Sequence, residues 1–208
     1  MTERLKPNGR GLERAAGLLS NGGRVAFPTE TVYGLGGDAR QGKAVAGIFA
    51  AKERPEFNPL IIHVLAVAYW PGPLTLVLPL RDGTDLSPLV SAGQDTIAVR
   101  VPASKLARDL LAEFGGPIAA PSANPSGKSS ATMADHVLDG LDGKIEAVLD
   151  GGRTTVGLES TIIGLHGKPT LLRAGGIPSE EIERALGRPL AAAAPTEILA
   201  PGLLKSHY

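Results

Sequence analysis

Apolar side chains recur at helical spacing in several segments of the chain. In the first segment Leu12, Ala16 and Leu19 share one face, and Gly22-Gly23 ends the helix. The second segment, residues 44–52, ends before Pro55, because the residue preceding a proline rarely continues a helix. The same pattern predicts helices over residues 12–19, 44–52, 104–114, 132–141 and 179–187.

Polar residues mark where three of these helices begin. Ser104 is expected to cap the helix that runs to residue 114. Thr132 and Asp135 have the spacing of a capping box at the start of the next helix. Ser179 opens the last helix, and Gly187 closes it.

Short apolar runs with strand character separate the helices. The run 96–101 alternates, so Arg100 lies on the face opposite Ile97 and Val99. Residues 28–37 contain too many turn formers for a regular element, and a loop is expected there. Strands are predicted over residues 24–27, 60–64, 74–80, 96–101, 118–120, 147–149, 161–165 and 170–173.

Helices and strands are mixed along the chain without strict alternation, which is typical of an α/β or α+β domain. We expect one twisted, mixed sheet with helices around it. Residues 190–201 are rich in alanine and proline, which is typical of a linker. The predicted organisation is a domain over residues 1–187, followed by a linker or tail over residues 188–208.

Composition narrows the functional class. Of the 208 residues 43% are hydrophobic and 4% aromatic, so a globular domain with an aliphatic core is expected. A formal net charge of zero disfavours a protein that mainly grips nucleic acid. The absence of cysteine excludes disulfides, cysteine-based zinc sites and a cysteine nucleophile. No apolar run is long enough to span a bilayer, so we expect a cytoplasmic protein without membrane contact.

Two cations stand near the end of the second helix. Lys52 and Arg54 are followed by Pro55 and by Asn58-Pro59. A point charge beside a bidentate fork suits the phosphates of an anionic ligand. The alternative is a basic helix end that complements the helix dipole. The stiff proline loop favours ligand binding, because loops of this kind position functional groups.

Two further loops combine turn formers with small polar side chains. Pro121-Ser122-Ala123-Asn124 follows a buried strand and fits either a rigid ligand loop or a turn that satisfies its own backbone. Ser130 extends a hydroxyl-rich stretch behind it. Thr29-Glu30-Thr31, with Tyr33, places hydroxyls and a carboxylate at a strand exit. Neither a Walker A loop nor a Rossmann fingerprint is present, so nucleotide binding would use neither device.

Arg100 and His63 are the remaining candidates. A buried arginine needs an anionic partner, which Asp95 or Glu159 could supply within the protein and a carboxylate could supply from a ligand. His63 ends an apolar strand, where a lone histidine is more often structural than catalytic. Ser160 precedes a strand and is placed to face the same pocket. The histidines do not cluster in the sequence, so no metal cage of protein ligands is predicted.

Six short strings, in their order along the chain, resemble the YrdC family, the threonylcarbamoyl-AMP synthases. Any one of them is weak evidence, whereas the ordered set is specific. The match extends from about Gly22 to Ile177. The strings are Phe27-Pro28-Thr29-Glu30-Thr31-Val32-Tyr33-Gly34-Leu35, Lys52-x-Arg54-Pro55 with Asn58-Pro59-Leu60, Pro71-Gly72-Pro73-Leu74-Thr75, Ala98-Val99-Arg100-Val101-Pro102, Pro121-Ser122-Ala123-Asn124 and Glu159-Ser160-Thr161.

The resemblance implies a fold and a reaction. The fold would be a twisted open sheet with flanking helices around a concave, positively charged site. The enzyme would convert L-threonine, bicarbonate and ATP into threonylcarbamoyl-AMP and pyrophosphate, with Mg²⁺ accompanying the nucleotide. A separate transferase would then use the product to modify the tRNA adenosine next to the anticodon. No stable complex with nucleic acid is expected.

The resemblance also implies roles for individual residues. Those implied to bind ATP are Lys52, Arg54, Asn58, Thr96, Ser122, Asn124, Ser130 and Arg173. Those implied to bind threonine are Thr31, His63, Arg100 and Ser160, with Arg100 paired to the threonine carboxylate. The catalytic set would be Lys52, Arg54, Ser122 and Asn124. The reaction needs no nucleophilic side chain, because positioning and charge neutralisation suffice.

Two features depart from the family pattern. The family has a further helix between His63 and Tyr69, where this chain has only a few residues. The tail from Ala200 resembles the linker that leads to a second domain, so we expect the N-terminal domain of a two-domain protein whose second domain is absent. The alternatives are a YrdC-like module that binds RNA or nucleotide without turnover, a carbamoyl-transfer module, and an enzyme inactivated by its short middle or tail.

Overall fold

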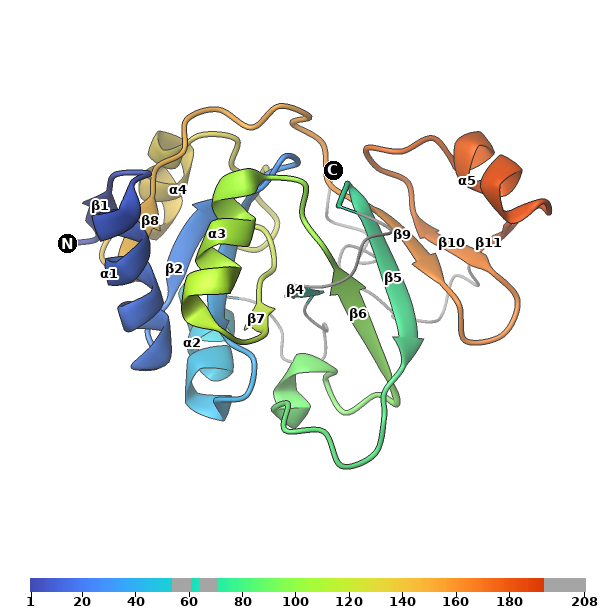
Figure 1. Cartoon of the computed structure of the whole chain (residues 1–208), viewed down its shortest axis with the longest axis horizontal. Coiled ribbons are helices and arrows are strands. Elements are labelled where there is room, and N and C mark those ends of the chain that lie inside the picture. Colours follow the sequence, from blue (N-terminus) through green and yellow to red (C-terminus); the bar gives the residue numbers. More distant parts are fainter. Residues whose placement is uncertain (54–60, 64–70, 193–208) are drawn as a thin grey trace.

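The computed structural model describes residues 1–53, 61–63 and 71–192. The strands of this part form one eleven-stranded mixed sheet in the order β1-β8-β2-β3-β7-β4-β6-β5-β9-β10-β11 (Figure 1). For example, β2 runs antiparallel to β3 and parallel to β8. The strands are β1 (Glu3–Leu5), β2 (Val25–Pro28), β3 (Tyr33–Asp38), β4 (Ile61–His63), β5 (Leu74–Pro79), β6 (Thr96–Arg100), β7 (Ile118–Ala119), β8 (Ala147–Leu149), β9 (Thr161–Gly164), β10 (Thr170–Arg173) and β11 (Ala191–Ala192).

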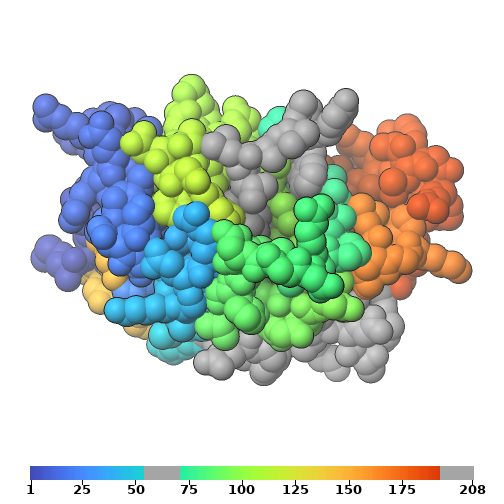
Figure 2. Space-filling model, turned by 60° about the horizontal axis from the view of Figure 1, so that its bottom comes forward, coloured from blue at the N-terminus to red at the C-terminus, as the bar shows by residue number. Residues whose placement is uncertain are grey.

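Helices cover both faces of the sheet around β2. The helices α1 (Gly9–Ser20) and α3 (Lys105–Phe114) lie side by side on one face (Figure 1). The other face carries α2 (Gly42–Lys52), α4 (Ala134–Leu141) and the short 3₁₀ helix η1 (Pro88–Val90). Figure 2 shows the green surface of the segment between β5 and β6 next to the light-blue surface of α2. The helix α5 (Ser179–Leu186) lies beyond β9 and β10 at the far end of the molecule.

The strand β2 shows how its sequence builds two cores. Val25 and Phe27 point into the core beneath α1 and α3, whereas Ala26 points into the core beneath α2 and α4. All three are fully buried, so the strand contributes to both layers. On the adjacent β3, a Cβ at Gly36 would lie 2.7 Å from Phe27 Cε1 and 2.8 Å from Ile118 Cγ2. The packing therefore requires glycine at that position.

The predicted mixed sheet with flanking helices is confirmed, and each predicted helix has a counterpart. One local prediction was wrong, because residues 33–38 form β3 and not a loop. The strand pairs on both sides, with β2 and with β7, so backbone hydrogen bonds outweigh the weak strand propensity of its glycines. The predicted capping box of α4 is also wrong, since Met133 is the N-cap residue and Thr132 contacts His136.

Both ends of the sheet were missed. The strand β1 pairs in parallel with β8, and β11 pairs in parallel with β10. The pairing of Ala191 with Thr170 places a strand at the start of the expected linker. The remainder of that linker, and the short segment between His63 and Tyr69, lie outside the described residues. The division at residue 187 stays a prediction. Within the described ranges no helix has the length and apolar character needed to cross a bilayer.

Candidate active site

Three segments that are distant in sequence meet in one place: the turn between β2 and β3, the turn after β7, and the segment that leads into β9. Main-chain hydrogen bonds hold them together. Ala123 N donates to the carbonyl oxygen of Tyr33 at 2.7 Å, and Gly157 N donates to that of Thr31 at 3.0 Å. The sheet therefore brings three of the polar strings identified in the sequence to one location.

Arg100, at the end of β6, lies at the centre of the first cluster of side chains. Its side chain is only 4% exposed. Nη2 donates to Glu30 Oε1 at 2.5 Å, Nη1 donates to Thr31 Oγ1 at 2.9 Å, and Nε donates to the Gly72 carbonyl at 3.2 Å. A guanidinium has five N–H donors. Three of them have acceptors within the described residues. We call Glu30, Thr31 and Arg100 the Arg100 cluster.

The ion-pair partner of Arg100 is Glu30, and not Asp95 or Glu159, the two candidates within the protein that the sequence suggested. Burial lowers the pKa of the Arg100 guanidinium, and the ion pair with Glu30 offsets this only in part. The charges of Arg173 and Glu159 also act on this pKa, so a second ion pair lies nearby. A buried charge of this kind persists only with a close counter-charge.

The hydroxyl groups of Thr29 and Thr31 pack against each other beside Arg100. Thr29 Oγ1 donates to the carbonyl oxygen of Val32 at 2.7 Å and lies 2.8 Å from Thr31 Oγ1. Because the Thr29 proton is used in this way, Thr31 donates its own proton to Thr29. Thr31 then accepts the hydrogen bond from Arg100, so each hydroxyl proton has a defined direction.

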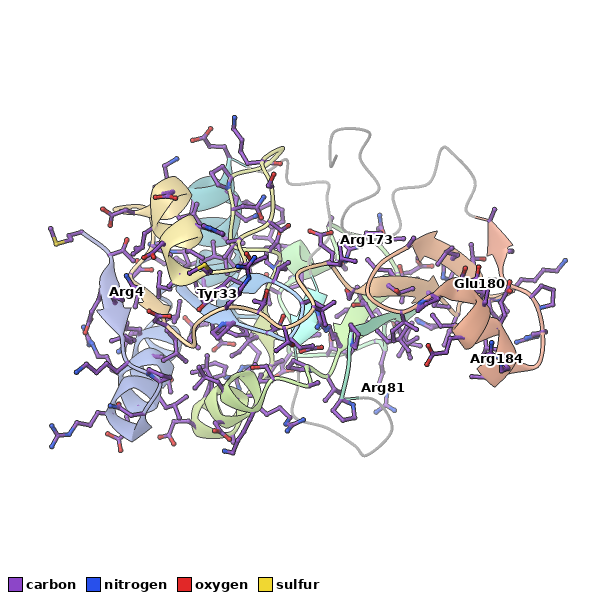
Figure 3. All side chains as sticks on the ribbon, turned by 90° about the horizontal axis from the view of Figure 1, so that it is seen from above. Arg4, Tyr33, Arg81, Arg173, Glu180 and Arg184 are labelled. Atoms are coloured by element: carbon purple, nitrogen blue, oxygen red, sulfur yellow. The ribbon has the colours of Figure 1, made fainter. Side chains whose placement is uncertain are left out.

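A second cluster surrounds Arg173 at the end of β10 (Figure 3). Arg173 forms an ion pair with Glu159, and its Nη2 lies 3.1 Å from Ser160 Oγ. Ser160 Oγ is 2.7 Å from Thr75 Oγ1. Ser130 Oγ donates to Glu159 Oε1 at 2.7 Å. We call these five residues the Arg173 cluster. It joins Ser130, Ser160 and Arg173, which were predicted separately.

A cavity of about 500 Å³ opens beside the Arg173 cluster. Val32, the neighbour of Thr31, lies on one wall, and Ser130 and Glu159 of the Arg173 cluster lie on another. This volume falls within the usual range for small-molecule sites. The lining residues are Val32, Ser129, Ser130, Gly157, Leu158, Glu159, Ala174 and Gly175.

Lys52 lies against the turn that carries Ser122 and Asn124. It is the last residue of α2 and is 1% exposed. Its Nζ donates to the carbonyl oxygens of Ser122 and Asn124, and Ser126 N donates back to the Lys52 carbonyl at 2.8 Å. Asn124 Nδ2 donates to the Lys128 carbonyl at 2.6 Å. The structure therefore brings Lys52, Ser122 and Asn124 together and fixes the turn from both sides.

Of the other predicted residues, His63 and Thr96 are placed by the structure, whereas two more lie outside the residues it describes. His63 pairs in register with Arg100 between β4 and β6, which places its backbone beside the Arg100 cluster. Thr96 begins β6, and four residues of extended chain separate it from Arg100 by roughly 13 Å. Its buried hydroxyl has no hydrogen-bond partner in the described part of the chain. Arg54 and Asn58 lie outside the described residues.

Sequence reasoning did not identify Glu30 or Thr75 as site residues. The signal for Glu30 was its position between two threonines at a strand exit. Thr75 ends one of the strings that carry the resemblance, but nothing in that string assigned its hydroxyl to the site. Across residues 1–53 and 71–192, no group of three histidine, aspartate or glutamate side chains is arranged to hold a metal ion.

Comparison with known proteins gives a consistent result. A family model described as "Telomere recombination", for Sua5, YciO and YrdC proteins, matches residues 17–68 and 64–175. The chain is 49% identical over 193 residues to threonylcarbamoyl-AMP synthase of Pyrococcus abyssi, covering 83% of this chain and 56% of that protein. It is 45% identical over 207 residues to the Bacillus subtilis protein of the same name, covering 90% of this chain and 60% of that protein.

A solved structure agrees with these sequence matches. The crystal structure of P. abyssi Sua5 complexed with L-threonine superimposes with a TM-score of 0.92 at 42% identity, covering 100% of this chain and 68% of that chain. The chain spans 56% and 60% of the length of the two curated relatives. Sequence and fold agree over most of the chain, which therefore belongs to the Sua5/YciO/YrdC family.

Proposed function

We propose that this chain carries the active site of a threonylcarbamoyl-AMP synthase. One observation supports this most: Arg100 and Arg173 are each bonded to a hydroxyl and a carboxylate, and Glu159, the partner of Arg173, lines a cavity of about 500 Å³. Such a site suits a ligand with two anionic ends. The similarity to relatives named threonylcarbamoyl-AMP synthase supports the same assignment.

Threonine binding is assigned to Thr31, His63, Arg100 and Ser160. The two remaining N–H donors of Arg100 would bind the threonine carboxylate, since a guanidinium can serve two carboxylates at different edges. The related P. abyssi structure was solved with L-threonine, which supports an amino-acid pocket in this fold.

ATP binding is assigned to residues around the cavity and the turn after β7. Ser130 and Arg173 belong to the cluster that borders the cavity. Lys52 both fixes the Ser122–Asn124 turn and brings a positive charge to it. The full assigned set is Lys52, Arg54, Asn58, Thr96, Ser122, Asn124, Ser130 and Arg173, with Lys52, Arg54, Ser122 and Asn124 as the catalytic residues.

The reaction proceeds by charge neutralisation. The threonine amine forms a carbamate, either by condensing with bicarbonate, with loss of water, or by adding to CO₂, with loss of a proton. A carbamate oxygen then attacks the α-phosphorus of ATP, the bond to the β-phosphate oxygen breaks, and pyrophosphate leaves. Several anions must meet in one site, so fixed cations and hydroxyl donors lower the barrier by offsetting their repulsion.

Mg²⁺ would enter as part of the nucleotide substrate, bound mainly through phosphate oxygens. This fits a site whose described residues include no three-ligand metal cluster. We further propose that a cytoplasmic transferase consumes the adenylate to modify tRNA next to the anticodon, and that the synthase itself forms no stable complex with nucleic acid or membrane.

Pyrophosphate release tests the proposal. Purified protein is incubated with ATP and Mg²⁺, with and without L-threonine and bicarbonate. We expect release only when both are present. ATP binding without release would instead favour the YrdC-like binding module, and salt-dependent RNA binding would strengthen that alternative.

A further inference from the structure

We propose that Glu30 is a positioning residue that sets the orientation of the Arg100 guanidinium for the threonine carboxylate. This inference rests on the proposed function. Glu30 carries no role in the assigned site, yet its side chain is 10% exposed and sits directly against Arg100. A carboxylate this close to an anion-binding arginine would oppose substrate binding unless it also served to hold that arginine in place.

The first argument is the geometry of the carboxylate. Oε1 accepts from Arg100 Nη2 at 2.5 Å. Oε2 accepts from the backbone N–H groups of Ala103 and Ser104, at 3.0 and 3.2 Å. These two N–H groups lie at the start of α3, where Ser104 is the N-cap residue. The two oxygens therefore act separately, because one holds the guanidinium while the other anchors the carboxylate to a helix.

The second argument is that the main chain of Glu30 is fixed as well. Its carbonyl oxygen accepts from Val156 N at 2.7 Å. Val156 immediately precedes Gly157 and Leu158, which line the cavity. Glu30 therefore connects Arg100, the start of α3 and the wall of the cavity. Such a junction limits the rotation of Arg100, whose remaining donors then face a constant direction.

The amide of glutamine cannot replace this carboxylate. It has one acceptor oxygen and one donor nitrogen, whereas the site presents N–H donors on both sides. In Glu30→Gln the NH₂ group must therefore face either Arg100 or the α3 N–H groups. Either choice breaks one half of the junction. The resulting error in the Arg100 orientation weakens binding of a carboxylate that needs a bidentate partner.

The experiment measures threonine and ATP dependence separately. In Glu30→Gln we expect the threonine concentration for half-maximal pyrophosphate release to rise about tenfold or more, with kcat changed little, because uniform binding is lost. ATP binding measured without threonine should stay within about twofold. Calorimetric titration with L-threonine provides a readout that does not depend on turnover.

Glu146→Gln is the matched control. Glu146 also accepts from an arginine guanidinium and from a backbone N–H, both of Arg24, but it lies outside the site. This variant should lose stability while threonine dependence remains unchanged. If Glu30→Gln behaves like Glu146→Gln, with lower stability but an unaltered threonine requirement, Glu30 is only structural and the proposal is overturned. Tighter threonine binding in Glu30→Gln would overturn it too.

Glu30→Asp keeps the test decisive if the glutamine variant does not fold. Aspartate retains the charge but is shorter by one methylene, so it cannot reach Arg100 and α3 together. A folded Glu30→Asp protein should show a raised threonine requirement, and a wild-type value contradicts the positioning role. Failure of the proposed function looks different, since the wild-type chain would then show no threonine-dependent release at all.

Discussion

At the scale of single residues, Tyr33 shows how a buried polar group is satisfied. Its hydroxyl donates to the Gly152 carbonyl at 2.8 Å and accepts from Gly151 N at 3.2 Å. Burial raises the pKa of this phenol to about 12, so it stays neutral at physiological pH. Figure 3 shows Tyr33 near Arg4, in the part of the molecule opposite to α5. The hydroxyl therefore links β3 to the segment after β8.

Tyr33→Phe is expected to lower the free energy of unfolding by about 1 kcal/mol, because two part-buried hydrogen bonds of the hydroxyl, with Gly151 N and the Gly152 carbonyl, are lost. Urea unfolding at pH 7 measures the change. Leu158→Ala, at a residue that is 60% exposed, should shift stability by less than about 0.5 kcal/mol. Equal effects of the two substitutions would mean that the Tyr33 hydrogen bonds contribute nothing.

At the level of single residues, the sequence correctly predicted which side chain needs an ion-pair partner, but it did not identify that partner. The strand pattern correctly indicated that Arg100 is buried and requires an anion. It could not select Glu30, because the two residues are 70 positions apart and meet only through the sheet. Likewise, nothing in the sequence shows that Lys52 reaches main-chain carbonyls, since every residue offers that acceptor.

At the scale of elements, the strand β3 explains why a local rule failed. Turn-forming glycines at residues 34, 36 and 37 suggested a loop, yet all three are buried in a strand paired on both sides. Tertiary contacts decide such segments, because close packing against Phe27 leaves no room for a side chain at Gly36. Helices with strong periodicity, such as α1 and α3, were predictable without this information.

Gly175, just after β10, tests the junction of two elements at the site. A Cβ there would lie 2.4 Å from the Glu159 carbonyl oxygen and 2.5 Å from Thr161 N. Main-chain atoms cannot move aside as a flexible side chain can, so Gly175→Ala should displace the segment that carries Glu159 and Ser160. We expect a loss of about 1–3 kcal/mol in stability, together with a loss of pyrophosphate release.

Gly17→Ala is the control for this substitution. Gly17 lies in α1, and a Cβ there meets no atom within 4 Å. Alanine in an open helical position should stabilise the protein by about 0.5–1 kcal/mol. Thermal unfolding of both variants distinguishes the two cases. A Gly175→Ala protein as stable as the wild type would show that the segment before β9 can shift at little energetic cost.

At the scale of the whole molecule, the candidate cavity is lined by segments that lie far apart in the sequence. Its walls come from the β2–β3 turn, the loop before α4, the segment before β9 and the residues after β10. No single stretch of sequence contains this arrangement. The ordered strings nevertheless predicted the family, and two of them contain residues of the cavity wall, Val32 and Glu159.

Ion pairs that join distant segments make the stability of the whole fold depend on pH. Asp150 pairs with Arg4, 146 positions away, and Glu146 pairs with Arg24, 122 positions away. For both carboxyls burial alone would raise the pKa. At Asp150 the hydrogen bonds from Gly152 N and Arg4 outweigh burial, so the pKa is lowered. At Glu146 the hydrogen bonds from Arg24 outweigh burial in the same way, and this pKa is lowered too.

A lowered folded-state pKa means that the unfolded chain binds more protons in acid. The unfolded values are about 3.9 for Asp and 4.3 for Glu. The stability from these pairs is therefore fully present above about pH 5 and is lost as the pH falls through 4 toward the lower folded values.

Urea unfolding between pH 7 and pH 3 should show a level free energy followed by a decline. Asp150→Asn should start lower at pH 7 and decline less steeply, because one titrating pair is gone. Parallel curves for the two proteins would show that the pair between Asp150 and Arg4 does not contribute to the pH dependence of stability.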